Sequence, residues 1–295
     1  MPELPEVETL KRELSRAIVG LKIKNCQVLW AKAISPLSPE EFARQIKNKK
    51  MVAVRRRAKM LFLDLGGDLA LAVHLKMTGQ LIYKDIAGGP ARNAMHSVAG
   101  GHPDDQMTEK QPSKYTRIVF EFTDKSKLYF NDLRKFGWVR LVDDKQINSL
   151  IEKLGPEPLS PIFTHQLLVD IFKKYPNRTV KQILLDQRLI AGIGNIYADE
   201  ACFLSKLRPD RKANTLKPSQ IKNLRENIIK VLKLSIQKKG TSSRNYRRSD
   251  GSQGGFVPHL KVYGRADEPC KICERPIQKI RHAGRGTHFC PHCQK

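Results

Sequence analysis

Four cysteines near the end of the chain restrict its possible folds more than any other feature. They form two C-x2-C pairs, Cys270 with Cys273 and Cys290 with Cys293, separated by sixteen residues. Each pair lets two thiolates reach one ion from a tight turn, and four thiolates complete a closed tetrahedral shell. The spacing therefore predicts a small C-terminal module that folds around one structural Zn²⁺.

Two disulfides are the alternative use of these cysteines, and disulfides are typical of exported proteins. The N-terminus carries Glu3, Glu6 and Glu8 where a secretory signal has a basic and then an apolar segment. The best candidate for a membrane span, residues 60–75, contains two aspartates. We therefore expect a cytoplasmic protein with no membrane partner, in which zinc explains the cysteines better than disulfides do.

The charge of the chain indicates a polyanionic partner. Its 295 residues include 54 Lys and Arg against 29 Asp and Glu, which gives a formal net charge of +25. Nucleic acid and an anionic membrane surface both attract such a protein, and the charge alone does not choose between them. Because 40% of the residues are hydrophobic, the chain can also bury cores, which excludes disorder throughout.

Hydrophobic patterning predicts an α+β multidomain protein. Apolar residues at helical spacing predict a helix over residues 5–19, and short β-like runs over 22–142 indicate an antiparallel sandwich or barrel. A polar stretch, 85–113, interrupts those runs, and we expect a surface insertion without regular structure there. Further helices are predicted at 164–174, 178–186, 195–204 and 218–238. We expect a β-rich domain at 1–145, a linker at 146–160, a helical domain at 161–259 and a zinc finger at 260–295.

The first nine residues, MPELPEVET, carry the sharpest chemical signal. Removal of Met1 would leave Pro2 as a terminal secondary amine, and because terminal amines have a pKa of about 8, much of it is uncharged at neutral pH. Glu3 and Glu6 can donate and accept protons beside it, and an amine next to a carboxylate suits imine chemistry on a sugar carbon. The alternative is that Pro2 only leads into a helix whose first turn carries glutamates. Nine residues do not decide between the two.

Seven blocks of the sequence, in order from residue 1 to residue 295, resemble bacterial formamidopyrimidine-DNA glycosylases, also called 8-oxoguanine DNA glycosylases. The blocks are MPELPEVET at 1–9, RRRAK at 55–59, HLKMTG at 74–79, NDLRKFG at 131–137, LGPEPLS at 154–160, IAGIGNIYADE at 190–200 and GRGTHFCPHCQK at 284–295. The resemblance implies an N-terminal β-sandwich, a helix–two-turn–helix domain and a β-hairpin zinc finger. It also implies a base-excision enzyme, which we expect to be a nucleoid-associated monomer, acting on double-stranded DNA that contains oxidised purines or abasic sites.

The resemblance further implies a mechanism. Pro2 attacks C1′ of the damaged nucleotide, the base departs, and the resulting Schiff base undergoes β- and then δ-elimination. Glu3 matches the acid that opens the sugar ring, Lys59 matches a lysine assigned to proton transfer and to the phosphate beside the lesion, and Glu6 matches a supporting carboxylate. Arg285 matches the arginine that grips the lesion's phosphates and is implicated in the second elimination. Without the resemblance, Lys59 would be only a basic surface residue.

The chemistry requires the damaged nucleotide to leave the base stack, and something must fill the hole. The family's wedge positions fall on Met77, Arg134 and Phe136. They combine a flexible apolar filler, a hydrogen-bonding group for the orphaned cytosine and an aromatic ring. For Met77 and Phe136 the alternative is core packing. The resemblance places further DNA contacts at His74, Tyr115, Arg117, Asn195 and Lys181, the last of which we expect on a loop.

Two further segments bear on DNA contact. Residues 240–258 correspond to the loop that closes over the extruded base, with Ser242 and Tyr246 as candidate lesion contacts. The composition of this segment also suits an inert linker. Tyr115 and Arg117 stand where the family usually has two histidines, which changes the expected contacts with the DNA backbone.

Two other functions stay open at the level of sequence. Enzymes that resemble endonuclease VIII use the same amine chemistry on oxidised pyrimidines, but Leu4, in place of a glycine, and the separated wedge residues favour the purine branch. The second alternative is a non-catalytic DNA-binding protein on the same scaffold. Borohydride trapping of a covalent adduct distinguishes an enzyme from such a protein.

Overall fold

The computed structural model describes residues 1–85, 111–241 and 255–295, and the main chain of 97–101. The chain is divided between two compact units. The first contains Met1–Ile151 and Lys238–Val257, and the second contains Glu152–Gln237 and Pro258–Lys295. Within the described ranges, no helix has the length and apolar character needed to cross a membrane.

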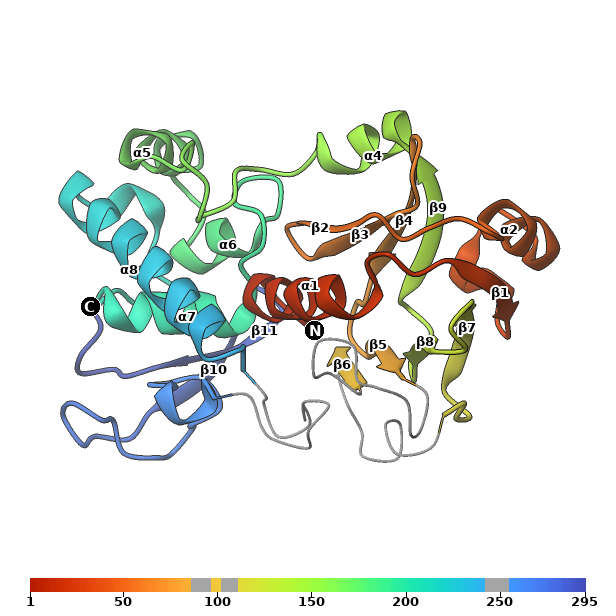
Figure 1. Ribbon diagram of the computed structural model, residues 1–295. Coiled ribbons are helices and arrows are strands. Elements are labelled where there is room, and N and C mark those ends of the chain that lie inside the picture. The colour runs from red at the N-terminus through yellow and green to blue at the C-terminus, as the bar shows by residue number, and fades with distance from the viewer. Residues whose placement is uncertain (86–96, 102–110, 242–254) are drawn as a thin grey trace. The chain divides into compact units, whose positions relative to one another are not determined.

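Two antiparallel sheets form the body of the first unit (Figure 1). One sheet has the strand order β1–β7–β8–β5–β6 and the other has the order β2–β3–β4–β9. The strands are β1 (Ile23–Val28), β2 (Ala53–Arg57), β3 (Met60–Asp64), β4 (Leu69–His74), β5 (Gly79–Lys84), β6 (Ser97–Gly101), β7 (Thr116–Phe122), β8 (Lys127–Asp132) and β9 (Trp138–Asp143). Within the β-like span predicted at 22–142, the runs at 60–65, 69–74, 118–122 and 127–130 correspond to β3, β4, β7 and β8.

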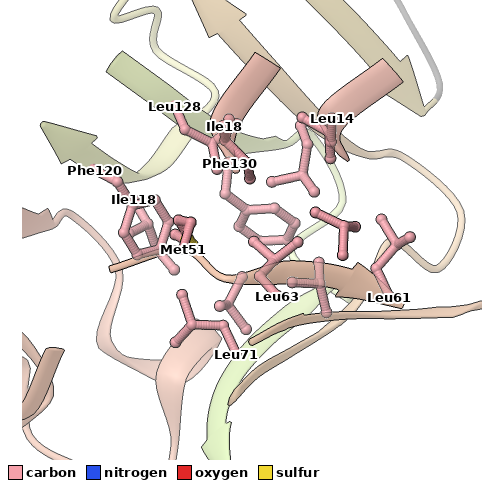
Figure 2. Close-up of a cluster of buried hydrophobic side chains, with 14 of the residues drawn as sticks. Leu14, Ile18, Met51, Leu61, Leu63, Leu71, Ile118, Phe120, Leu128 and Phe130 are labelled. Atoms are coloured by element: carbon pink, nitrogen blue, oxygen red, sulfur yellow. The ribbon is translucent and has the colours of Figure 1, made fainter. Parts of the chain in front are cut away.

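Side chains from both sheets and from helix α1 (Leu4–Ile18) share one hydrophobic core (Figure 2). Leu63 and Leu71 come from one sheet, and Phe120 and Phe130 come from the other. Helix α1 contributes a buried stripe at helical spacing, which is why its sequence period predicts it correctly: Val7, Leu10, Leu14 and Ile18. The core between two antiparallel sheets confirms the β-sandwich.

The other elements of the first unit include one correction. They are the 3-10 helix η1 (Ala31–Ile34) and helices α2 (Pro39–Ile46) and α4 (Asp144–Ile151). We expected no regular structure in 85–113, yet β6 lies within it and pairs along β5. Small residues such as Gly100 and Gly101 leave no hydrophobic period, so this edge strand is defined by backbone pairing that the sequence does not show. Helix α4 also occupies the start of the span expected to be a linker.

The second unit combines helices with a zinc-finger hairpin (Figure 1). Its elements are α5 (His165–Lys174), α6 (Val180–Leu185), α7 (Asn195–Leu204), η3 (Ala213–Thr215), α8 (Pro218–Gln237), η4 (Val257–His259, which begins at the boundary), β10 (Gln278–His282) and β11 (Arg285–Phe289). The four predicted helices are all present. Thr164 and Thr179 cap α5 and α6 through their hydroxyls, which explains why these helices begin where the sequence indicates. Helix α7 packs against α8, α6 and β11.

Candidate functional site

The N-terminal helix begins immediately after the candidate nucleophile. Pro2 is buried, and Glu3 is the N-cap residue of α1. Glu6, at the third helical position, closes a capping box, and its Oε2 accepts a hydrogen bond of 3.0 Å from the Glu3 N–H. The carboxylates that the sequence places near Pro2 thus also fix the start of the helix. The side chain of Met1, by contrast, is 41% exposed.

Glu6 also joins the helix to a distant part of the chain. Its Oε1 accepts hydrogen bonds from the Thr241 N–H (2.8 Å) and the Thr241 Oγ1–H (2.9 Å). The backbone of Gly240 lies close to the same carboxylate: a Cβ added at Gly240 would be 3.0 Å from Glu6 Oε1. The φ of Gly240 is +86°, a conformation that favours glycine. Glu6 therefore anchors the first two residues of the candidate capping loop. Ser242 and Tyr246 themselves lie outside the described residues.

Lys59 lies in the turn between β2 and β3 and is only 6% exposed, so it is not an ordinary surface lysine. The preceding Ala58 has a φ of +53°, and its carbonyl accepts a hydrogen bond of 3.0 Å from Arg56 Nη1. Arg56 Nε in turn donates to Glu8 Oε2 on α1 at 2.9 Å. Burial raises the pKa of Glu8, but hydrogen bonds from Arg56 and Arg12 outweigh burial and lower it. A charged Glu8 therefore helps to hold the Lys59 turn.

His74, at the end of β4, is held as a neutral imidazole. Burial, with the charges of Lys76 and Lys59, lowers the pKa of His74 to about 3. Its Nδ1 accepts a hydrogen bond of 3.0 Å from the Lys76 N–H. In a neutral ring the proton is then on Nε2, which can donate to a phosphate oxygen without any dependence on pH near neutrality.

The three wedge candidates come from two turns of the first unit. Met77, before β5, is half-buried, and Arg134 and Phe136 lie in the exposed loop between β8 and β9. Phe136 is 55% exposed, which excludes core packing, and the Arg134 guanidinium lies 4.9 Å from its ring centroid. An exposed aromatic ring beside a cation suits contact with nucleic-acid bases.

The two residues that replace the customary histidines have contacts within the protein. Arg117 Nε donates to the Asp132 carbonyl at 2.9 Å, and its Nη1 donates to the Lys114 carbonyl at 3.2 Å. Burial lowers the pKa of Arg117, and Asp132 partly offsets this effect. Tyr115 accepts a backbone hydrogen bond from the Asp132 N–H, and its ring lies 5.2 Å from Lys114 Nζ. Both residues support the start of the wedge loop.

In the second unit, a hydrogen bond joins the start of helix α7, which carries Asn195, to strand β11, which carries Arg285. Asn195 is the first residue of α7, and its Nδ2 donates to the Gly286 carbonyl at 2.9 Å. Arg285 is exposed at the start of β11, after a two-residue turn in which Ala283 and Gly284 have φ values of +50° and +71°. Such a turn joins two strands tightly and presents the residue beside it.

Lys181 is not on a loop, so our prediction of its position is wrong. It lies in the first turn of α6 and is 0% exposed. Its Nζ donates to Asp199 Oδ1 (2.5 Å), Thr287 Oγ1 (2.8 Å) and the Gly286 carbonyl (3.2 Å), which accounts for its three N–H groups. Asp199 Oδ2 also accepts the His288 N–H at 2.9 Å. Lys181 therefore ties the hairpin beside Arg285 to helices α6 and α7.

The four C-terminal cysteines converge as their spacing predicts. Their Sγ atoms all lie within 4.8 Å of one another. The Sγ atoms of Cys270 and Cys293 are 3.9 Å apart and those of Cys273 and Cys290 are 3.5 Å apart, too far for a disulfide bond of about 2.05 Å. Four thiolates fit one structural zinc ion and leave no position open for catalysis. Phe203, Val262 and Ile277 pack around the cluster.

Family models match most of the chain. The formamidopyrimidine-DNA glycosylase N-terminal domain matches residues 1–139, the formamidopyrimidine-DNA glycosylase H2TH domain matches 154–247, and the zinc finger found in FPG and IleRS matches 267–295. The chain belongs to the formamidopyrimidine-DNA glycosylase family.

Relatives of known name and structure agree with this assignment. The formamidopyrimidine-DNA glycosylases of Listeria monocytogenes (serotype 4b, strain F2365) and Carboxydothermus hydrogenoformans are 39% and 40% identical to this chain, with all of each chain covered. Lactococcus lactis Fpg in complex with DNA containing an abasic site is 34% identical, with a TM-score of 0.84 and 99% of each chain covered. The same protein bound to DNA containing N7-benzyl-Fapy-dG has a TM-score of 0.84, 34% identity and full coverage.

The structure adds supporting residues to this formamidopyrimidine-DNA glycosylase fold that sequence reasoning missed. Asp132 and Asp199 are both 0% exposed. Asp132 binds the β8–β9 loop, which carries Arg134 and Phe136, and Asp199 binds strand β11, which carries Arg285. Gln187 spans the turn before α7, because its Nε2 donates to the Ile193 carbonyl and its Oε1 accepts the Gly192 N–H. The only sequence signal for these residues is their position inside the family's blocks or next to them.

Proposed function

We propose that this protein is a bifunctional DNA glycosylase and AP lyase of base excision repair that removes oxidised purines, such as 8-oxoguanine and formamidopyrimidines, from duplex DNA. Family membership supports the reaction class. The observation that carries the proposal is the N-terminus itself, where Pro2 directly precedes a helix whose N-cap is Glu3. The Lactococcus lactis Fpg complexes contain abasic-site or N7-benzyl-Fapy-dG DNA, which is the kind of DNA that such a reaction consumes or produces.

The mechanism begins with removal of Met1, which the small Pro2 that follows it permits. The lone pair of the Pro2 nitrogen then forms a bond to C1′ as the C1′–N bond to the base breaks. The base leaves with its electron pair and takes up a proton, and the Pro2 nitrogen gives up its N–H proton. Opening of the sugar C1′–O4′ bond gives the Schiff base, and O4′ takes a proton, for which Glu3 is the proposed donor. Loss of a C2′ proton with the 3′ phosphate, and then of a C4′ proton with the 5′ phosphate, gives the two eliminations, and water hydrolyses the Schiff base to release Pro2.

Other residues are proposed to bind, orient or transfer protons. Lys59, in its buried turn, is assigned proton transfer, and His74 is assigned a phosphate contact through Nε2–H. In the second unit, Arg285 and Asn195 are assigned the phosphates beside the lesion, with Arg285 also serving the second elimination. The zinc ion supplies only the fold of the hairpin. These assignments divide the work between a catalytic domain at 1–145 and the domains at 161–259 and 260–295.

A trapping experiment tests the proposal. Borohydride reduces a Schiff base, so the protein without Met1 should form a covalent adduct with an abasic-site duplex, and mass measurement should place it on Pro2. Pro2→Gly should lose most of the adduct. Absence of adduct with an intact Pro2 terminus would indicate the non-catalytic DNA-binding alternative, and undiminished adduct in Pro2→Gly that mass measurement places on a lysine would move the nucleophile to that lysine.

Substrate class requires a second measurement. Cleavage rates on matched duplexes with 8-oxoguanine or thymine glycol should favour 8-oxoguanine, and a strong preference for thymine glycol would assign the protein to the endonuclease VIII-like branch. We further propose that the protein acts as a monomer on the nucleoid in the cytoplasm. Its charge of +25 supports such retention on DNA.

A further inference from the structure

The loop between β8 and β9 holds large apolar side chains in solvent. Leu133 is 45% exposed and Phe136 is 55% exposed, and Lys135 between them has a φ of +58°. Apolar side chains that are exposed cannot order a loop by burial. The order of this loop must therefore come from its polar contacts.

A buried carboxylate supplies several of those contacts. Asp132, the last residue of β8, is 0% exposed. Its Oδ1 accepts hydrogen bonds from the Thr78 Oγ1–H (2.5 Å) and the Arg134 N–H (3.2 Å), and its Oδ2 accepts one from the Gly137 N–H (2.7 Å). Asp132 therefore binds both ends of the loop and the turn that carries Met77.

Thr78 and Gly137 make this arrangement specific. The Thr78 hydroxyl donates to Asp132 and also accepts the Arg134 N–H at 2.9 Å, so it bridges the two wedge segments. At Gly137, an added Cβ would lie 2.8 Å from Phe130 Cζ and 3.1 Å from Asp132 Oδ2. The loop backbone thus packs directly against the carboxylate with no room for a side chain.

Arg117 also supports the start of the β8–β9 loop, through hydrogen bonds to main-chain carbonyls. Its Nε donates to the carbonyl of Asp132 at 2.9 Å, while Nη1 donates to the carbonyl of Lys114 at 3.2 Å. The guanidinium also places a positive charge near the buried carboxylate. Arg117, one of the two residues that depart from the family's histidine pattern, is therefore bonded to the base of the wedge loop.

We propose that Asp132, Thr78 and Arg117 are positioning residues that hold Arg134 and Phe136 in a fixed relation to Met77 before DNA binds. This inference rests on the proposed function, because only DNA with an extruded nucleotide presents a hole and an orphaned base. A preformed loop does not lose further conformational freedom when it enters the duplex. Because Arg134 is held in one position, its hydrogen bonds discriminate between the bases opposite the lesion.

The test measures kcat/KM on two duplexes, one with 8-oxoguanine opposite cytosine and one with 8-oxoguanine opposite adenine. The ratio of the first value to the second is compared between variants, because any inactive protein lowers both values equally and cancels. Arg134→Ala provides the value without base contact. Thr78→Val keeps the side-chain shape and removes the hydroxyl, and it should lower the ratio at least fivefold towards the Arg134→Ala value. Asp132→Asn should do the same, whereas Thr78→Ser, the matched control, should stay within twofold of the unchanged protein.

Two results would overturn this inference: an unchanged ratio in Thr78→Val, or an unchanged ratio in Arg134→Ala. Borohydride trapping on a single-stranded abasic oligonucleotide separates it from the proposed function, since that substrate has no opposite base. Failure of the unchanged protein to trap on an abasic duplex would overturn the proposed function. Equal trapping by the unchanged protein and Thr78→Val, together with a lower duplex ratio in the variant, supports the positioning role.

Discussion

Two buried aspartates, one in each unit, hold candidate contact segments in different ways. Asp132 and Asp199 are both 0% exposed. Asp132 accepts hydrogen bonds from a hydroxyl and two backbone N–H groups, and the loop that it binds has an exposed tip. Asp199 pairs with the ammonium group of Lys181 and accepts the His288 N–H, so it joins a helix to a strand.

This difference predicts different consequences when each network is broken. Removal of one partner from a buried ion pair leaves an uncompensated charge in a medium of low polarity, which is among the costliest single changes in a protein. When a carboxylate that is held by hydroxyl and N–H donors loses one acceptor oxygen, one donor is left without a hydrogen bond. This change costs less free energy of unfolding, and its effect is local. The second unit should therefore lose stability, whereas the first should lose the geometry of one loop.

Lys181→Met should have the largest effect. It leaves Asp199 buried without its cation, and we expect the second unit to lose about 3–5 kcal/mol of stability. The measurement is chemical denaturation of the zinc-loaded protein, in which unfolding is monitored through a signal that comes from the second unit. The double variant Lys181→Met/Asp199→Leu is the control, because it removes both charges and should recover part of the loss. A loss below about 1 kcal/mol in the single variant would contradict the ion-pair interpretation.

Asp132→Asn should have a smaller and local effect. The amide keeps the shape of the carboxylate but presents N–H groups where a donor already points, so we expect a loss of about 1–3 kcal/mol. Hydrogen exchange should quicken at the Arg134 and Gly137 amides and stay unchanged in the β10–β11 hairpin. Lys181→Met should show the opposite pattern. Matching exchange profiles in the two variants would show that the networks are not independent.

Acid should produce the smallest effect, and it should affect the two units in different pH ranges. The folded pKa of His74 is about 3, below its usual value of about 6.5, so its contribution to stability is complete above pH 6.5 and is lost as the pH falls. Between pH 7 and 5.5 the first unit should lose about 1 kcal/mol. The hydrogen bond from Arg188 lowers the pKa of Asp186 in the second unit, so that stabilisation is lost only below about pH 4. Thermal unfolding across this range checks the order, and His74→Gln should remove the earlier loss.

Much of the candidate site followed from spacing along the chain. The cysteine pattern predicted a cluster whose Sγ atoms do lie within 4.8 Å of one another, because each pair needs only a local turn. Helices α1, α5, α6, α7 and α8 followed from hydrophobic patterning, which acts within a few positions along the chain. The wedge loop followed from a family resemblance, and the exposure of Phe136 agrees with that interpretation.

The sequence by itself determined the zinc cluster, the helices and the terminal amine chemistry that we propose, because each depends on neighbours in the chain. Only the tertiary structure decided that Lys181 is buried, since its acceptors Asp199 and Thr287 lie 18 and 106 positions away. It likewise decided that Asp132 binds Thr78 across 54 positions. Burial and pairing of this kind arise when distant segments pack together, and a lysine or aspartate has the same local pattern whether it is later exposed to solvent or enclosed.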